Sequence, residues 1–119
     1  MTDDKPIRAI SIQQPYAEMI LRGIKKEEYR SVVTHIRERV YIYASLTPGA
    51  EEDFEKINVE PGSLPTGVIV GSVEIVDCAT RKHLSKYIYA WKLANPKRLK
   101  TPIKPERQPQ PLFFKPFNN

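Results

Sequence analysis

Short apolar runs alternate with polar and turn-forming segments along the chain, and their spacing predicts several strands and two helices. The β-branched segment 7–12 (IRAISI) predicts a short strand. Pro15 follows it, and proline is favoured at the first position of a helix because its missing N–H has no partner there. Apolar side chains then recur at i, i+3, i+4 and i+7, which predicts a helix with one apolar face, and Gly23 supplies a stop. These apolar positions are Ala17, Ile20, Leu21 and Ile24.

Later segments of the chain show the same contrast between strand and helix patterns. Apolar residues alternate with Tyr and Ser over residues 40–45, as expected of a strand with two unlike faces. Residues 50–57 (AEEDFEKI) predict a short helix, because the helix dipole favours acidic residues in the first turn. The apolar segments 68–76 and 87–93 predict two more strands, and Gly71 marks a bulge or the close approach of another backbone.

The C-terminal part of the chain is rich in proline. Six of the 11 prolines lie in residues 95–116, which predicts an extended strap with one edge strand at residues 112–114. We therefore predict one domain over residues 1–95 and a basic, proline-rich strap over residues 96–119 that packs on the same domain. Strands dominate and two helices interrupt them, which predicts an α+β fold built on a curved or partly closed sheet.

Length and composition limit the classes of protein to which this chain can belong. With 119 residues it can build one core, which argues against a separate cofactor module, so we expect no cofactor. Cys78 is the single cysteine and there are two histidines, so we expect neither an internal disulfide nor a bound metal. The apolar runs fall well short of the roughly 20 residues that cross a bilayer, and the start MTDDKPIR lacks a signal-peptide core. We therefore predict a soluble, cytoplasmic protein without a membrane partner.

The net charge of +5 is unevenly distributed along the chain. Residues 1–78 carry 9 basic and 13 acidic side chains, whereas residues 79–119 carry 10 basic side chains and 1 acidic one. A basic segment of this kind attracts polyanions, most commonly nucleic acid, or serves only as a solvated linker that wraps the domain. The candidates for phosphate contacts are Lys97, Arg98, Lys100 and Lys104.

Polar side chains suited to chemistry are densest after the first predicted helix, in residues 23–30 (GIKKEEYR). Lys25 and Glu28 could act as a base and a water-orienting carboxylate, or they could form a structural ion-pair network with Arg30 on a strand that starts here. Glu74 interrupts an apolar strand, so it requires either a partner, with Lys25 or Arg30 as candidates, or an outward face.

Gln14 and Tyr16 flank the start of the first predicted helix, where free backbone N–H groups favour anions and carbonyl groups. Gln14 could read a base edge or cap the helix, and Tyr16 could contact a ligand or belong to the core. Tyrosines along the chain are interleaved with basic residues, an arrangement in which rings stack on bases while basic side chains contact phosphates. The alternative is that these tyrosines fill the core of a barrel. For Trp91 we predict core packing.

Four segments together resemble the ASCH family, whose members are relatives of the PUA-like RNA-binding domains. They are residues 11–16 (SIQQPY), the Gly-x-Lys-x-x-Glu-x-Arg motif of residues 23–30, residues 71–78 (GSVEIVDC) and the pair Ala90 and Trp91. The resemblance covers about residues 8–95. It implies a small PUA-like, partly closed β-barrel with two flanking helices, and a cleft, lined by the polar residues of the motif, that binds RNA or a modified nucleoside.

The resemblance leads to two functional hypotheses. The first is binding of RNA or a nucleotide-like ligand in the cleft. The second is an amidohydrolase acting on an acylated nucleoside such as N4-acetylcytidine, because some family members use a lysine, a threonine three residues later and a downstream glutamate for this reaction. This chain has Glu28 at the threonine position, and a carboxylate does not directly replace a hydroxyl nucleophile. The ligand-binding candidates are Gln14, Tyr16, Lys25 and Arg30, and the catalytic candidates are Lys25, Glu28 and Glu74.

A third hypothesis, from a different class, is a protein-interaction module. The proline-rich tail offers an extended segment on which a protein partner could dock.

Overall fold

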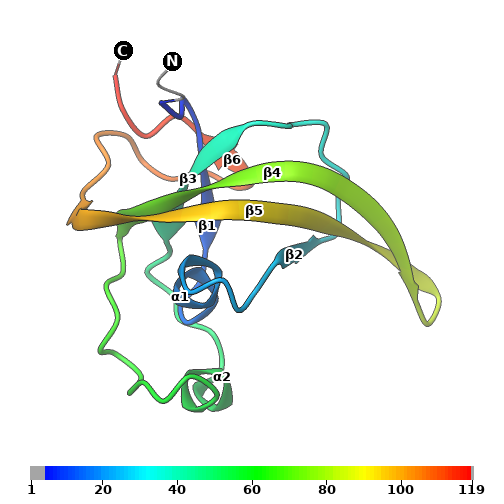
Figure 1. Cartoon of the computed structure of the whole chain (residues 1–119), viewed down its shortest axis with the longest axis horizontal. Helices are drawn as coiled ribbons and strands as arrows, with labels where there is room; N and C mark the ends of the chain where they lie inside the picture. Colours follow the sequence, from blue (N-terminus) through cyan, green and yellow to red (C-terminus); the bar gives the residue numbers. More distant parts are fainter. Residues whose placement is uncertain (1–4, 119) are drawn as a thin grey trace.

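The computed structural model describes residues 5–118 and contains one sheet and two short helices (Figure 1). The strands are β1 (Ala9–Ile12), β2 (Glu27–Arg30), β3 (Arg39–Ala44), β4 (Val68–His83), β5 (Lys86–Ile103) and β6 (Phe113–Phe114). The helices are α1 (Tyr16–Leu21) and α2 (Glu51–Glu55). The α+β fold with two helices that the sequence predicts is confirmed.

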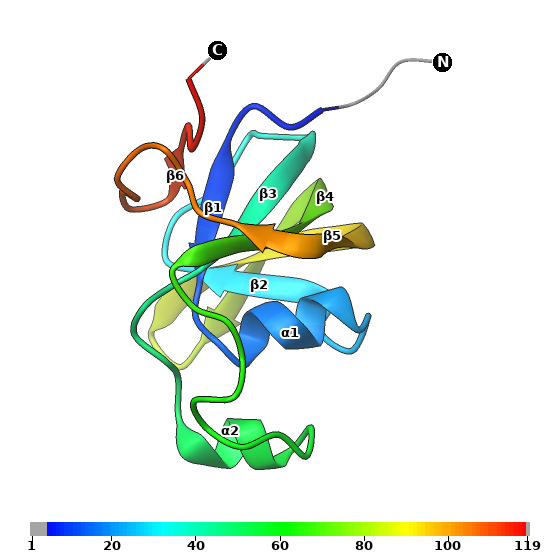
Figure 2. The same cartoon turned by 90° about the vertical axis from the view of Figure 1, so that its left-hand side faces the viewer.

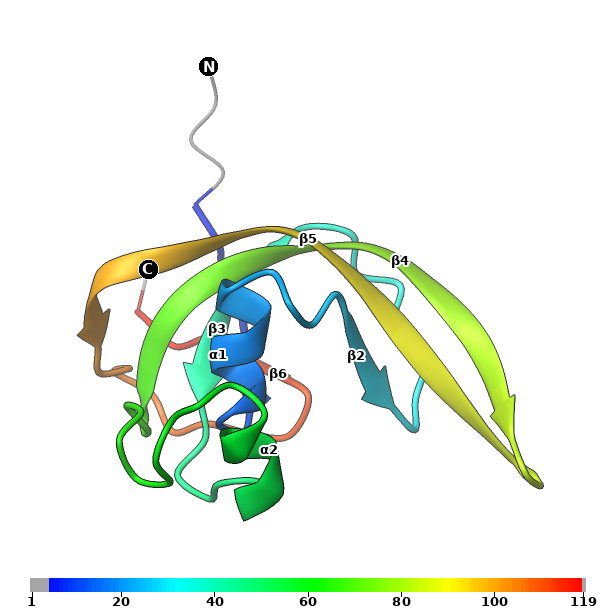
Figure 3. The same cartoon turned by 60° about the horizontal axis from the view of Figure 1, so that its bottom comes forward.

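The strands follow the order β2-β5-β4-β3-β1-β6 across the sheet. β1 and β3 are parallel, and the other neighbouring pairs are antiparallel. The sheet is strongly curved, with β4 and β5 arching over α1 and β2 (Figure 3). Within residues 5–118, β2 and β6 are the two edges of the sheet, so a curved open sheet replaces the partly closed barrel of the prediction. β2 has four residues and β6 has two, which is too short for the edges to join in a continuous ladder.

β4 and β5 form one hairpin that is longer than the apolar segments of the sequence indicate. β5 continues beyond residue 95 to Ile103, so the first part of the predicted strap is a strand, with Lys97 opposite Ser72. Pro96 is tolerated there because the register between the strands shifts at this point, and a bulge frees proline from the hydrogen-bonded ladder. The predicted edge strand near residues 112–114 is observed as β6.

Gly71 lies where the backbones of β4 and β5 approach each other closely beneath α1. A methyl group on Gly71 would overlap the carbonyl oxygen of Lys97 and would lie 2.6 Å from Cδ2 of Leu21. The ladder between β4 and β5 also shifts register on both sides of this residue. The close approach and the irregular pairing that the sequence suggested at this glycine are therefore both present.

The core lies between the concave face of the sheet and α1. Ala17 and Ile20 are buried on the inner side of α1, as their spacing predicts, but α1 ends at Leu21 and Ile24 is exposed. Trp91 is fully buried and stacks on Phe113, with 5.4 Å between ring centroids, so its predicted core position is confirmed. The main apolar cluster also contains Ile10, Ile12, Val40, Ile42, Val73 and Ile75.

α2 lies beyond α1, away from the sheet (Figure 2). Polar side chains of the first helical segment connect to this region: Arg22 donates a hydrogen bond to the carbonyl oxygen of Ile57 at 3.2 Å, and Gln14 donates to that of Pro65 at 3.0 Å. These two hydrogen bonds fix the loop that carries α2 to the segment that contains α1.

Candidate nucleotide-binding pocket

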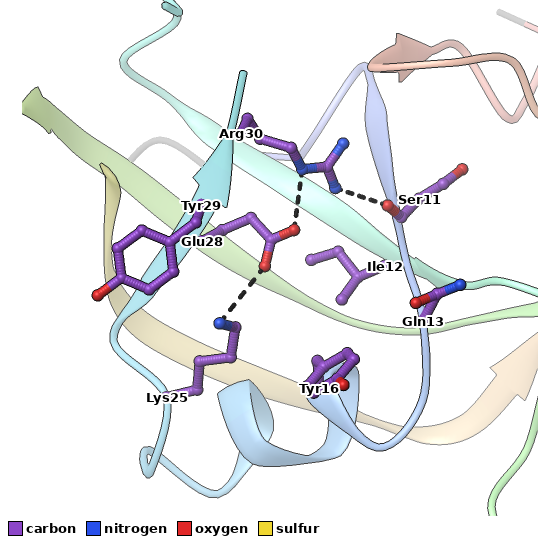
Figure 4. Close-up of a pocket in the computed structure, with 8 residues that line it drawn as sticks. All are labelled: Ser11, Ile12, Gln13, Tyr16, Lys25, Glu28, Tyr29 and Arg30. Atoms are coloured by element: carbon purple, nitrogen blue, oxygen red, sulfur yellow. Dashed lines mark hydrogen bonds and ion pairs between the residues drawn. The ribbon is translucent and has the colours of Figure 1, made fainter. Parts of the chain in front are cut away.

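An open pocket of about 420 Å³ lies between β1, the start of α1 and the edge strand β2 (Figure 4). It contains most of the polar residues of the motif in residues 23–30. The side chains that line it are those of Ser11, Ile12, Gln13, Tyr16, Lys25, Glu28, Tyr29 and Arg30.

Lys25 is held in place by the way α1 ends. Gly23 adopts a positive φ of 76°, a conformation that glycine takes without strain, and the chain turns back sharply after the helix. The backbone N–H groups of Ile24 and Lys25 both donate to the carbonyl oxygen of Met19, at 2.9 and 3.1 Å. The lysine backbone is therefore fixed at the junction between α1 and β2.

The Lys25 ammonium group faces an acceptor without being saturated by it. Its Nζ lies 3.7 Å from Oε1 of Glu28, a distance that permits ionic attraction but is too long for a good hydrogen bond. An ammonium group has three N–H donors. Donors of Lys25 therefore remain available to a ligand in the pocket.

Arg30 orients Glu28 and bridges the open side of the sheet. Its Nε donates to Oε2 of Glu28 at 2.9 Å, its Nη2 donates to the carbonyl oxygen of Ser11 at 2.8 Å, and its guanidinium carbon lies 5.5 Å from the centre of the Trp91 ring. Ser11 can accept this bond because β6 pairs only with Ala9 and Ile10, which leaves the next carbonyl group of β1 free on that side. Arg30 thus positions the carboxylate, and it has N–H donors left for a ligand.

Two tyrosines form aromatic walls on either side of Lys25. Its Nζ lies 5.8 Å from the ring centre of Tyr16 and 5.2 Å from that of Tyr29, within the range of a cation–π interaction. The Tyr16 hydroxyl donates to Asp53 at the start of α2, and this hydrogen bond, together with burial, raises the pKa of Tyr16 above 10.0. Tyr16 therefore forms part of the pocket wall, fastened from behind by the loop that carries α2.

Gln14 caps the helix and does not line the pocket. Gln14 is 1% exposed. Its Oε1 accepts a hydrogen bond from the backbone N–H of Glu18 at 3.0 Å, and its Nε2 donates one to the carbonyl oxygen of Pro65. The neighbouring Gln13 is exposed and lines the pocket instead. The sequence pattern indicates which glutamine is exposed. Ser11 and Gln13 alternate with Ile10, Ile12 and Gln14, and alternate side chains of an extended segment face opposite sides.

Glu74 is not part of this site. Its Oε1 accepts from Arg39 at 3.1 Å and from Asn95 at 3.2 Å, and its side chain is 39% exposed. The predicted partnership with Lys25 or Arg30 is therefore wrong, and the outward-facing alternative is the one observed. The physical reason is register: Glu74 is directly opposite Arg39 of β3, on the face of the sheet away from the buried Val73 and Ile75.

The predicted phosphate-contact residues lie at the end of β5 far from the hairpin tip, and just beyond that end (Figure 1). None of the four lines the pocket. Lys97, Lys100 and Lys104 are exposed. Arg98 is exposed as well, but its guanidinium group binds both carboxylate oxygens of Glu18, at 2.8 and 2.9 Å, so its charge is already paired within the fold.

Glu18 is the buried centre of that ion cluster. Arg22 also donates to it, at 2.8 Å, at the i,i+4 spacing that brings two side chains together on a helix surface. Burial on its own would raise the pKa of Glu18, but the hydrogen bonds from Arg98 and then Arg22 outweigh burial, and the pKa lies below 4.5.

Two further properties concern the described residues as a whole. Within residues 5–118, no group of three or more His, Cys, Asp or Glu side chains is arranged to hold a metal ion. The helices in this range are too short and insufficiently apolar to cross a membrane.

Comparisons with known proteins agree with this architecture. A family model described as "ASCH domain" matches residues 10–104. Activating signal cointegrator 1 from Homo sapiens and from Mus musculus are each 30% identical over 88 residues, a segment that covers 65% of this chain and 15% of each relative. The crystal structure of ASCH from Zymomonas mobilis superposes with a TM-score of 0.65 at 16% identity, covering 95% of this chain and 88% of the other.

Proposed function

Because this chain belongs to the ASCH domain family, with a match over residues 10–104, we propose that it binds RNA or a nucleotide-like ligand and holds one nucleoside in the pocket beside Lys25. One observation carries the proposal: an ammonium group with free donors and a carboxylate acceptor lie 3.7 Å apart in an open pocket flanked by two tyrosine rings.

The size and chemistry of the pocket fit a nucleobase. Its volume of about 420 Å³ lies in the range of sites for small molecules, and both polar side chains and aromatic rings line it. An amine donor beside a carboxylate acceptor matches a base edge on which a carbonyl or ring nitrogen adjoins an N–H group. Aromatic side chains at the pocket walls offer the stacking surfaces by which proteins hold unpaired bases.

The charge of the C-terminal third supports a polyanionic ligand. Lys97, Lys100 and Lys104 are exposed on or just after β5, and they can attract phosphates without base specificity. The curated relatives support only a domain-level function, because the matching segment makes up 15% of their length. We therefore propose a ligand class for this domain and carry over no activity of the whole relative.

The experiment is titration of the protein with fluorescently labelled RNA and with free nucleotides, comparing Lys25→Ala with Lys26→Ala. Lys26 is adjacent, carries the same charge and is exposed outside this pocket, so it is a matched control. We expect Lys25→Ala to lower nucleotide affinity by about tenfold, as expected for a hydrogen bond to a charged group, while Lys26→Ala has little effect. Undetectable binding of RNA and nucleotides by the unaltered protein at 50 mM salt would contradict the proposal.

The amidohydrolase alternative has weaker support. Lys25 and Glu28 lie in a common pocket, but Glu74 is paired with Arg39 and does not join them. Glu28 would have to activate water alone. Chromatography of N4-acetylcytidine after incubation with the protein tests this alternative; an absence of turnover, or turnover that Lys25→Ala leaves unchanged, removes it.

A further inference from the structure

We propose that the projecting part of the β4–β5 hairpin is a platform for single-stranded nucleic acid that continues from the pocket. This hairpin arm, residues 80–89, extends past β2 to a free tip (Figure 3). The inference rests on the proposed function, since the pocket is taken to hold one nucleotide of the bound strand and the arm to hold its neighbours.

The strand register assigns each side chain of the arm to one of two faces. Residues opposite each other in an antiparallel pair project to the same face of a sheet. Trp91 projects into the core on the concave face of the sheet. The residues opposite it on β2 and β4, and every second residue along β5, therefore lie on the same face. The opposed pairs on this face are Glu28 and Trp91, Arg30 and Tyr89, Thr80 and Tyr89, and Lys82 and Tyr87.

This concave face joins the pocket directly. Arg30 lines the pocket and is opposite Tyr89, which is half-buried against the core cluster. Tyr87 follows two residues farther toward the tip, about 7 Å along the strand. Tyr87 is 59% exposed, and Lys82 lies opposite it on β4. The order from the pocket outward is thus a guanidinium group, one tyrosine, and then a second tyrosine paired with a lysine.

The chemistry of this face fits an unpaired strand of nucleic acid. Exposed aromatic rings stack bases of any sequence, and lysines beside them contact the phosphates. Residues 80–89 contain Arg81, Lys82 and Lys86 and no acidic side chain, so the arm is complementary in charge to a polyanion. On the convex face Arg81 contacts Glu27 at 3.4 Å.

The two faces of the arm offer a matched test. Lys82 lies on the concave face and Lys86 on the convex face, both are exposed, and both are close to the tip. Lys82→Ala, Tyr87→Ala and Lys86→Ala are compared for binding of a labelled RNA octanucleotide of mixed sequence and of the four mononucleotides. Tyr87 and Lys82 are both outside the core, and thermal unfolding of each variant shows whether its fold is retained.

We expect the unaltered protein to bind the octanucleotide at least tenfold more tightly than any mononucleotide. Tyr87→Ala should lower octanucleotide affinity about tenfold, Lys82→Ala should lower it several-fold, and Lys86→Ala should have a smaller effect, because base stacking and phosphate contacts are confined to the concave face. None of the three variants should alter mononucleotide binding.

Three results would overturn the platform. The first is equal affinity for the octanucleotide and a mononucleotide, which leaves the pocket as the binding site. The second is an equal loss of octanucleotide affinity in Lys86→Ala and Lys82→Ala, which indicates electrostatic attraction that does not depend on the face of the arm. The third is tighter binding of the same octanucleotide after it has been annealed to its complement than of the single strand. A protein that binds neither RNA nor mononucleotides contradicts the proposed function itself, so the two failures are distinguishable.

Discussion

Glu18 and Glu28 each interact with two basic side chains, and the two carboxylates are only ten positions apart in the sequence. Glu18 accepts from Arg98 and Arg22, whereas Glu28 accepts from Arg30 and lies near Lys25. The side chains of the two glutamates are similarly covered, with 8% and 13% exposed. The charge and the burial of the carboxylate therefore do not distinguish the two glutamates.

The difference lies in how many hydrogen-bonding positions each cluster leaves open. In the Glu18 cluster both carboxylate oxygens are held by one guanidinium group in a bidentate arrangement, and Arg22 adds a third bond. In the Glu28 cluster one oxygen has a close partner and the other faces an ammonium group 3.7 Å away, at the wall of a pocket. A saturated cluster stabilises the fold, whereas an unsaturated one at an opening can recognise a ligand.

The change expected to break the saturated cluster most severely is Gly71→Ala. The added methyl group would overlap the Lys97 carbonyl group and Leu21, which forces β5 away from β4 and moves Arg98 away from Glu18. We expect a loss of about 3 kcal/mol in the free energy of unfolding, at the upper end for overpacking. Urea denaturation measures this loss. Gly62→Ala is a contrasting glycine variant, because a methyl group there meets no atom within 4 Å and its cost comes only from the positive φ of 89°, about 1 kcal/mol. A loss in Gly71→Ala no larger than in Gly62→Ala would contradict the packing argument.

The paired variants Glu18→Gln and Glu28→Gln test the comparison directly. Glu18→Gln replaces hydrogen bonds between charged groups inside the fold, and we expect it to lower the free energy of unfolding by about 2 kcal/mol. Glu28→Gln should lower that free energy by less, since its cluster is unsaturated, but it should weaken nucleotide binding. Denaturation and ligand titration of both variants provide the two measurements. If Glu18→Gln impaired binding and Glu28→Gln impaired folding, the assignment would be reversed.

The smallest expected effect is in the pH dependence of stability. Because the folded-state pKa of Glu18 lies below 4.5, its charged form favours the folded protein, and this contribution is complete above pH 4.5. It is lost as the pH falls through the lowered folded-state pKa. We therefore expect Glu18→Gln to lose less stability than the unaltered protein between pH 5 and the acid limit of folding. Parallel pH dependences for the two proteins would show that Glu18 does not contribute.

Local sequence patterns predicted the elements whose side chains alternate or recur regularly. The inward face of α1, the strand over residues 40–45 and the core position of Trp91 follow from periodicity and size. The grouping of Lys25, Glu28 and Arg30 also follows, because a helix stop and a short strand bring neighbours in sequence together. What these features share is that their contacts lie close in sequence or depend on burial alone.

The features that the sequence did not reveal depend on register between distant strands. Whether Glu74 meets Lys25 or Arg39 is decided by its pairing with β3, which a single strand pattern does not contain. Bulges between β4 and β5 set where β5 runs beneath α1, and the ion pair between Arg98 and Glu18 depends on this position. The same bulges allow β5 to continue through Pro96. Gln14 belongs to the motif, but the alternation of side chains along the chain, and not membership of the motif, places Gln13 at the pocket.

The shortness of β6 determines how Arg30 is anchored at the pocket. Phe114 and Phe113 pair with Ala9 and Ile10, and the next position in register would place Leu112 opposite Ser11. Leu112 has a φ of 64°, a left-handed conformation that is incompatible with a strand, so the ladder stops one residue early. The Ser11 carbonyl group is left for Arg30. A single backbone conformation in the C-terminal segment thus exchanges one further rung of the sheet for the hydrogen bond that anchors Arg30 at the pocket.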